Sequence, residues 1–228
     1  MSCDLKKDVV RQLRNINKFL VENNIILAYQ EPKITSNTIE LSSDVSFVLN
    51  NENYESIYNE CIKNKAFNFL LLDTAIIQLM YEFDNRGKKL KKHRLAYFPN
   101  PNVEQFVENL EYENIYFNSK NISVEYIEKN SVVFPIRFDF DIDNRKYKEI
   151  DHPKSHLTLG NYKNCRIPVS SWLTPKLFVE FILRNFYYKK FKKIESNWKF
   201  KIKEIKNSFL NTNFLSNNEK KIIHLNYE

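Results

Sequence analysis

Glycine is nearly missing from this chain, in which Gly87 and Gly160 are the only glycines among 228 residues. An average protein contains about 7% glycine. P-loop NTPases, Rossmann dinucleotide-binding domains and protein kinases all need several glycines close together, because only glycine lets the backbone turn tightly around a phosphate. The sequence therefore excludes these three classes and favours a fold of ordinary strands and helices.

The rest of the composition is that of a globular protein. Hydrophobic residues make up 43% and charged residues 28%, and 18 Phe and 13 Tyr can fill a large core. The cysteines Cys3, Cys61 and Cys165 are too far apart for a disulfide framework or a metal knuckle. No apolar signal core begins the chain, and its most apolar stretch is too short to cross a bilayer. We expect a cytoplasmic protein without membrane contact.

Two hydrophobic periodicities predict the secondary structure. Apolar residues recur every three or four positions over 4–23 and 52–65, which predicts amphipathic helices. A further short helix is expected over 103–110. The segment from Asp84 to Gly87 predicts a hairpin turn with Gly87 in the left-handed region. Residues typical of strands fill the runs 25–30, 38–49, 67–72, 76–83, 94–98, 131–143, 156–159 and 166–169.

The last third of the chain is predicted to be helical. Thr174 and Pro175 form a helix start, with threonine as the cap and proline in the first turn. An apolar stripe then continues to Phe209, which predicts one long helix or two in succession. We expect an α+β fold, a single domain over 1–228 with a mainly antiparallel sheet flanked by helices and a long basic helical C-terminal part over 174–228.

The net charge of +7 is concentrated in two clusters. Residues 86–94 contain six Lys or Arg and no acid, and residues 189–206 contain eight Lys and two Glu. Nucleic acid is bound largely through its phosphates, so these clusters predict nucleic-acid contact, although solvated lysines remain the other interpretation. The residues expected to bind it are Arg86, Lys88, Lys89, Lys91, Lys92, Arg94, Lys189, Lys190, Lys192 and Lys193.

The most concentrated polar feature is a strand-like run followed by a turn. Strand alternation places Asp139 and Asp141 on one face, and Pro153 keeps the backbone of His152 extended, so His152 and His156 flank a turn. Two imidazoles and several carboxylates could bind a divalent metal or act as acid and base. These two Asp and two His are the candidate catalytic residues. The alternative is a solvated strand face and a turn whose histidines bind backbone groups. No cofactor-binding pattern is present.

The apolar stripe near the C-terminus must be buried somewhere, either on this chain or on another. We expect a protein partner to cover it. The residues expected at this partner interface are Trp198, Ile202, Ile205 and Phe209.

Several segments resemble one protein family. They are Asp73-Thr-Ala-Ile-Ile-Gln78, His93-Arg-Leu-Ala-Tyr-Phe-Pro-Asn-Pro101, Asp151-His-Pro-Lys-Ser-His-Leu-Thr-Leu-Gly160, Cys165-Arg-Ile-Pro168 and Phe181-Ile-Leu-Arg-Asn-Phe-Tyr187. Together they resemble the bacterial domain of unknown function 2290 over about residues 1–190. The resemblance implies a bacterial cytoplasmic protein whose gene lies near ATPase and nuclease genes in mobile or anti-phage regions, and it supplies no activity.

Two functions follow as expectations. The first is an accessory nucleic-acid-binding subunit of a bacterial, anti-phage type defence complex that docks on a larger ATPase or nuclease. The alternative is a phosphodiester hydrolase that uses the two histidines and two aspartates named above. The sequence leaves open whether the protein is an enzyme, because no complete catalytic signature is present.

Overall fold

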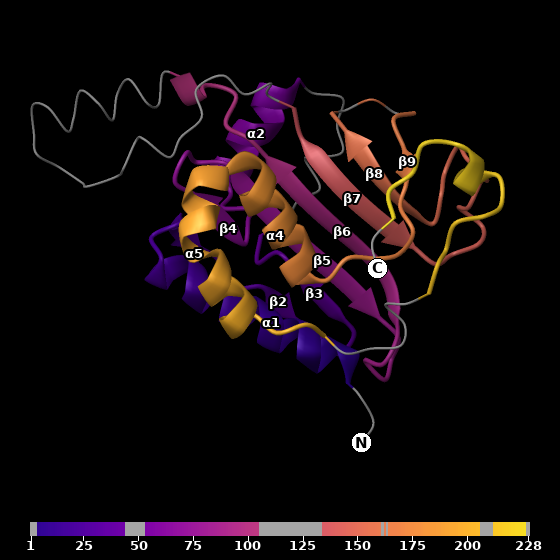
Figure 1. The fold of residues 1–228 in the computed structure, drawn as a ribbon, viewed down its shortest axis with the longest axis horizontal. Coiled ribbons are helices and arrows are strands. Elements are labelled where there is room, and N and C mark those ends of the chain that lie inside the picture. Colours follow the sequence, from indigo (N-terminus) through magenta and orange to yellow (C-terminus); the bar gives the residue numbers. More distant parts are fainter. Residues whose placement is uncertain are drawn as a thin grey trace, which may run out of the picture.

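The computed structural model describes residues 4–43, 53–104, 134–160, 162, 164–205 and 212–226. These residues form a sheet with helices packed on both of its faces (Figure 1). The helices described are α1 (Leu5–Glu22), α2 (Tyr54–Lys63), α4 (Pro175–Phe186) and α5 (Tyr188–Lys201), with a short 3-10 helix, η4 (Glu219–Lys221).

Every ladder of the sheet is antiparallel. The strands are β1 (Ile26–Tyr29), β2 (Lys33–Ile34), β3 (Thr38–Glu40), β4 (Phe69–Leu71), β5 (Ile76–Phe83), β6 (Leu90–Phe98), β7 (Ile136–Asp141), β8 (Ser155–Leu159) and β9 (Ile167–Pro168). Their order across the sheet is β1-β4-β5-β6-β7-β8-β9, and β3 pairs with both β2 and β5. The predicted α+β class, with a mainly antiparallel sheet flanked by helices, is confirmed.

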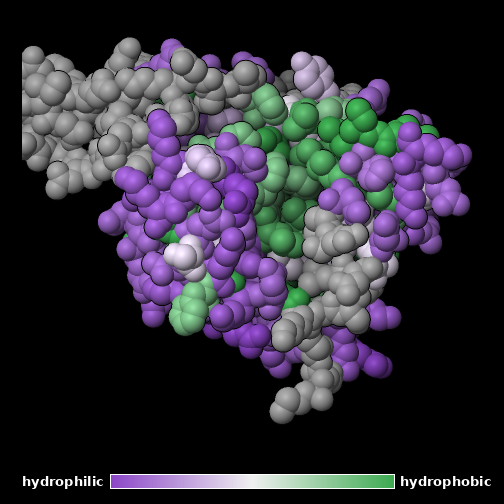
Figure 2. Space-filling model, in the orientation of Figure 1, coloured by the Kyte–Doolittle hydropathy of each residue, from purple (hydrophilic) through white to green (hydrophobic). Residues whose placement is uncertain are grey.

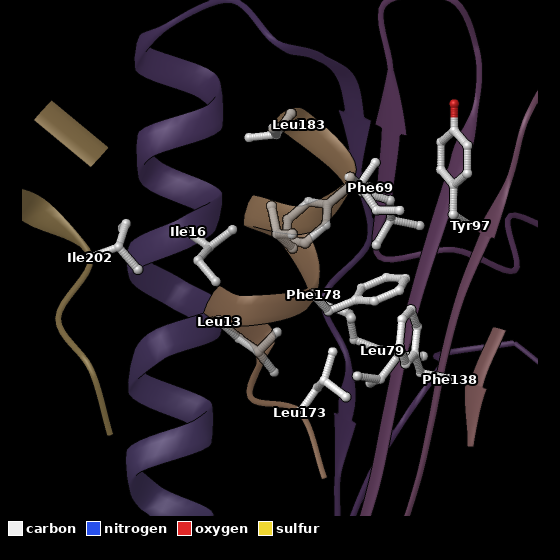
Figure 3. Close-up of a cluster of buried hydrophobic side chains, with 14 of the residues drawn as sticks. Leu13, Ile16, Phe69, Leu79, Tyr97, Phe138, Leu173, Phe178, Leu183 and Ile202 are labelled. Atoms are coloured by element: carbon white, nitrogen blue, oxygen red, sulfur yellow. The ribbon is translucent and has the colours of Figure 1, made fainter. Parts of the chain in front are cut away.

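Strand alternation divides the apolar side chains between two cores. On β5, Ile77 and Leu79 face α1 and α4, whereas Ile76 and Met80 face α2. The larger core lies between the sheet and the three helices α1, α4 and α5. Figure 3 shows Leu13 and Ile16 of α1 and Phe178 of α4 directed into the space between the helices and the strands, and Leu183 of α4 directed toward α1.

The helices α1 and α4 begin with side-chain caps, and the cap at Thr174 was expected from the sequence. The Asp4 carboxylate accepts a hydrogen bond from the backbone N–H of Lys7 at 3.2 Å, and the Thr174 hydroxyl accepts one from Leu177 at 3.2 Å. Each cap satisfies a backbone donor that has no partner inside its helix. A single polar side chain therefore stabilises the start of each of these two helices.

The predicted hairpin joins β5 to β6. Gly87 has a φ of +66° and donates to the Asp84 carbonyl at 2.9 Å. The Asp84 carboxylate also accepts from the backbone N–H groups of Lys88 and Lys89, at 2.7 and 3.1 Å. The strand after the turn begins at Leu90 and not at Arg94 as the sequence predicted, because the consecutive Lys91 and Lys92 interrupt the apolar alternation that marks a strand.

The C-terminal part begins as predicted, with two helices in succession, and departs from the prediction after residue 201. The chain forms two helices that meet at Tyr187, and α5 ends at Lys201. The described residues after it, 202–205 and 212–226, are not helical except for η4, so a helical part over 174–228 is wrong for them. Leu225 instead donates to Pro168 and accepts from Ser170, both at 2.8 Å. These bonds satisfy backbone groups at the edge of β9, which a helix would leave exposed.

Some predicted elements lie partly or wholly outside the described residues. Most of the short helix expected over 103–110 is outside them, as are the first residues of the strand expected over 131–143. Within the described part that strand is β7, which ends at Asp141.

An apolar surface lies beside α4. Figure 2 shows hydrophobic side chains gathered over β7 and β8, while the outer surface of α5 is hydrophilic. Half-buried apolar residues at the margin of the larger core include Phe134, Leu159, Ile167 and Phe181. We call these four residues the apolar margin.

Candidate functional site

The sheet brings two of the four candidate catalytic residues into one row. β7 pairs with β6 on one side and β8 on the other, so Asp139 lies directly opposite Arg94 and directly opposite His156. All three side chains are on the sheet face opposite α1 and α4, because Phe138 and Phe140 of β7 point into the larger core.

Asp139 is held by two arginines. Its Oδ1 accepts from Arg94 Nε at 2.9 Å, and its Oδ2 accepts from Arg137 Nε at 2.6 Å. Burial alone would raise the pKa of Asp139, but the charges of Arg137 and Arg94 outweigh it, and the pKa lies below its ordinary value. Asp139 is therefore a fixed anion with both oxygens occupied, which does not suit a general acid or base.

His156 is buried beside this ion cluster. Its ring is 5% exposed, and Nδ1 donates to the Pro153 carbonyl at 2.9 Å. Because a carbonyl only accepts, the neutral ring carries its proton on Nδ1, and Nε2 lies 3.9 Å from Asp139 Oδ2. Burial lowers the pKa of His156 to about 4, so the ring is neutral at pH 7.

His152 and Asp141 extend the site toward solvent. The His152 ring lies 5.1 Å from the His156 ring, centroid to centroid, and its Nδ1 donates to the Lys146 carbonyl at 2.8 Å. The Asp141 carboxylate accepts from Lys146 Nζ at 2.7 Å and from the backbone N–H of Asp143 at 3.0 Å. Asp141 thus fixes the lysine that lies next to His152.

His152 and Lys146 open onto a pocket of about 790 Å³, whose other cationic residues are Arg145, Lys148 and Arg166. Of the four candidate catalytic residues, only His152 lines this pocket. The described residues contain no group of three or more His, Cys, Asp or Glu side chains placed to hold a metal ion. Sequence reasoning missed the four cations, although the Arg-Lys-x-Lys run after the β7 aspartates was a visible signal.

A basic surface lies at the β5–β6 hairpin, at the same end of the strands as the β7–β8 connection, where the backbone N–H of Ile142 donates to the Lys91 carbonyl at 3.0 Å. Arg86, Lys88, Lys89 and Lys91 are exposed, and Lys92 is half-buried. None of these five forms an ion pair with another described residue. Arg94, which the sequence grouped with them, is bound to Asp139, so its expected role in nucleic-acid contact is corrected to a role in the ion cluster.

The hairpin lies against the first turn of α1. The backbone N–H of Lys6 donates to the Gly87 carbonyl at 2.9 Å. The exposed face of α1 then adds Lys6, Lys7, Arg11 and Arg14 around a hollow of about 510 Å³. Lys7 and Arg11 are paired with Asp4 and Asp8 at 2.9 and 2.6 Å. We call the hairpin cations, together with these four cations of α1, the basic end. The sequence analysis did not identify the α1 cations as part of a basic cluster.

Residues 19–227 match the family model described as an uncharacterised conserved protein, DUF2290. The chain belongs to the DUF2290 family. The match includes the lysine-rich segment after residue 190, which the sequence resemblance did not cover. Neither the curated proteins nor the solved structures contain a match. In the part of this DUF2290 chain that the structure describes, no helix is both long and apolar enough to span a membrane.

The lysines of α5 form a weaker candidate surface in this DUF2290 chain. Lys192 and Lys199 bind Glu195 at 2.8 and 2.9 Å, and Arg184 binds the same carboxylate at 2.9 Å. The hydrogen bond from Lys192, with those from Lys199 and Arg184, holds the pKa of Glu195 below its ordinary value. Part of the α5 charge is therefore neutralised. The other predicted contacts, Lys189, Lys190 and Lys193, lie on the same helix.

The predicted partner interface on the C-terminal stripe is corrected by the structure. Trp198, Ile202 and Ile205 are at most 6% exposed and belong to the larger core. Trp198 Nε1 donates to Glu180 at 2.8 Å, and its ring meets the edge of Phe19 at 5.3 Å. An amphipathic stripe must be buried, and α1 of the same chain supplies the surface that covers it. Phe209 lies outside the described residues.

Proposed function

We propose that this DUF2290 protein binds nucleic acid, DNA or RNA, through the phosphates, with the basic end as the contact surface. The observation that carries the proposal is the hairpin, where five cationic side chains have no ion-pair partner among the described residues. Unpaired surface lysines and arginines hold a layer of solvent anions and can exchange them for phosphates. The α5 lysines that bind Glu195 lack this property.

The geometry of the hairpin suits a phosphate contact. The Asp84 carboxylate binds backbone N–H groups and not the lysine ammonium groups, so it fixes the turn while Lys88 and Lys89 remain available. The bond from Lys6 to Gly87 ties the turn to α1. A rigid turn loses less conformational entropy when it binds.

The proposal includes the setting expected from sequence, an accessory subunit in the bacterial cytoplasm that docks on a larger ATPase or nuclease of an antiviral defence complex. An accessory role is favoured over the hydrolase because Asp139 and Asp141 are bound to arginine and lysine side chains. Support for a docking partner comes from the apolar margin, since half-buried apolar groups beside a core mark association surfaces. The proposal requires no cofactor.

The direct test compares two charge-reversed variants at one low salt concentration. Lys88→Glu with Lys89→Glu changes the hairpin, and Lys63→Glu with Lys65→Glu makes the same change in net charge at the end of α2. We expect the hairpin variant to lose about tenfold or more in affinity for a short DNA or RNA strand, because it loses two phosphate contacts. Equal losses in the two variants would show that only net charge matters, and would overturn the assignment of the surface.

The docking part of the proposal has its own test. Ile167→Asp with Phe181→Asp places two charges on the apolar margin, and Tyr188→Asp changes an exposed aromatic residue elsewhere on the surface as a control. Expressed with the products of neighbouring genes, the wild type and the control should co-purify with an ATPase or nuclease, and the double variant should not. Co-purification of the folded double variant would contradict docking at the apolar margin.

A further inference from the structure

The pocket beside His152 is separate from the basic end. Its walls come from the β7–β8 connection, from the chain just before β9, and from the C-terminal segment, which Figure 1 shows in yellow beside that connection. A volume of about 790 Å³ lies within the range of small-molecule sites, roughly 300–1,000 Å³. The pocket is therefore large enough for a nucleotide.

The charge in this pocket is incompletely balanced. Arg145 is bound to Asp143 and Lys146 to Asp141, each at 2.7 Å. Lys148 and Arg166 form no ion pair with another described residue. Arg166 Nη1 donates to the Asp151 backbone carbonyl at 3.2 Å, which sets the direction of the guanidinium but leaves its charge unpaired. Opposing these cations is one further acid that lines the pocket, the Asp151 carboxylate.

The pocket also has apolar and amide groups. Ile150 and Ile222 line it and are 41% and 40% exposed, and Asn164 contributes an amide. Apolar groups beside an amide suit a nucleobase, whose face packs against apolar side chains and whose edge forms hydrogen bonds. Cations beside such a surface suit the phosphate of the same ligand.

The wall formed by Ile150 is held in an unusual conformation. Ile150 has a φ of +69°, which a β-branched residue rarely adopts. Paired backbone bonds between Lys148 and His152, at 3.1 and 2.7 Å, close the loop around it. The buried Glu219 carboxylate accepts from the Ile150 N–H at 3.4 Å. Strain of this kind gathers at ligand-binding loops, where it holds side chains ready for the ligand.

His152 adds a hydrogen-bond acceptor to the pocket. Its Nδ1 proton is committed to the Lys146 carbonyl, so Nε2 of the neutral ring can accept from a ribose hydroxyl. Behind it, the His156 ring and the Asp139 cluster limit where the His152 ring can lie. Hydrogen bonds from positively charged donors to phosphate are among the strongest in proteins.

We propose that this pocket binds a nucleotide through its terminal phosphomonoester, with Arg166 and Lys148 on the phosphate, His152 Nε2 accepting from a ribose hydroxyl, and Ile150 and Ile222 against the base. This inference deepens the proposed function and rests on it where the nucleotide is the end of a bound strand. The same chemistry is offered by a mononucleotide in solution, so the test distinguishes the two sources.

The experiment measures binding of short strands of one sequence that carry either a terminal phosphate or hydroxyl ends, with AMP as a separate probe. The variants are Arg166→Gln and Lys148→Gln, and the control is Lys220→Gln, an exposed lysine in η4 that does not line the pocket. Glutamine at 166 keeps an N–H donor for the Asp151 carbonyl. Melting temperatures confirm that each variant is folded.

We expect the wild type and the control to prefer the phosphorylated strand by about tenfold or more, a preference that AMP removes and that both pocket variants lose. AMP binding that depends on Arg166, without a preference for strand ends, would support the pocket and identify mononucleotides as the source. Equal affinity for both strands with no AMP binding, or a preference that survives both variants, would overturn the inference. Charge reversal at the hairpin is expected to weaken the binding of phosphorylated and unphosphorylated strands equally. The failure of one proposal can therefore be distinguished from the failure of the other.

Discussion

Asp139 illustrates what a strand position demands of a charged residue. A carboxylate removed from water is tolerated only when charges and hydrogen bonds replace its solvent. Arg94 and Arg137 each give it one Nε–H, at 2.9 and 2.6 Å. Asp139, a catalytic candidate in the sequence, is thus bound by Arg137 of its own strand and by Arg94 of the neighbouring strand. The sequence alone does not reveal the contact with Arg94.

His156 gives a residue-scale prediction about pH. Its folded pKa of about 4 lies below its ordinary value of 6.5, so as the pH falls below 6.5 the unfolded chain takes up a proton that the folded chain accepts only near pH 4. The free energy of unfolding should therefore decrease across this window, by up to about 3 kcal/mol from this residue. The buried His93, whose pKa burial lowers to about 3, acts in the same direction.

Urea unfolding of the wild type and His156→Ala, at pH 7.5 and at pH 5, tests this account. The substitution leaves the Pro153 carbonyl without its donor and should cost about 1–3 kcal/mol at pH 7.5. Because the titrating group is gone, the variant should then lose less stability than the wild type on acidification. A variant as stable as the wild type at pH 7.5 would show that His156 has no structural role.

At the scale of elements, the packing of α5 on α1 places the helical part of the C-terminal third on the larger core. Trp198→Ala should lower the free energy of unfolding by about 3–5 kcal/mol, because it removes a buried ring that meets Phe19 and donates to Glu180. Phe200→Ala, two residues along the same helix and 74% exposed, is the matched control and should change stability little. Chemical denaturation gives both values, and similar losses would contradict the placement of Trp198.

Elements whose signals are local were predictable from the sequence. The cap residue Thr174 and the turn at Gly87 determine backbone geometry through their immediate neighbours, and the structure has both where expected. The end of α5 was not predictable, because Ile202 and Ile205 continue the apolar spacing while contacts with α1 fix their positions. Periodicity identifies which residues are buried, but it does not specify which surface buries them.

The candidate site was predictable in part for the same reason. Alternation placed Asp139 and Asp141 on one strand face, and Pro153 placed the two histidines about a turn. The ion pair between Arg94 and Asp139 depends on the register between β6 and β7. The presence of Arg166 and Lys148 in one pocket depends on how β9 follows β8. Such long-range pairings leave no trace in local sequence patterns.

For the molecule as a whole, two surfaces carry different chemistry. The basic end and the His152 pocket share no lining residue, although the hairpin and the β7–β8 connection are joined by the hydrogen bond from Ile142 to Lys91. Each site combines residues far apart in the chain, such as Lys6 with Gly87 and Asp151 with Arg166. A single bound strand is expected to use the basic end for its backbone and the pocket for its terminal nucleotide.

The salt dependence of nucleic-acid binding tests the central claim most directly. The affinity for a short DNA duplex should fall with salt, so that log Kd rises linearly with log salt concentration, because each phosphate contact releases bound counterions. Lys88→Glu with Lys89→Glu should make the slope shallower by about 2, the number of contacts removed, while Lys63→Glu with Lys65→Glu should leave it unchanged. A hairpin variant with the wild-type slope, or a wild type whose binding is insensitive to salt, would contradict the account.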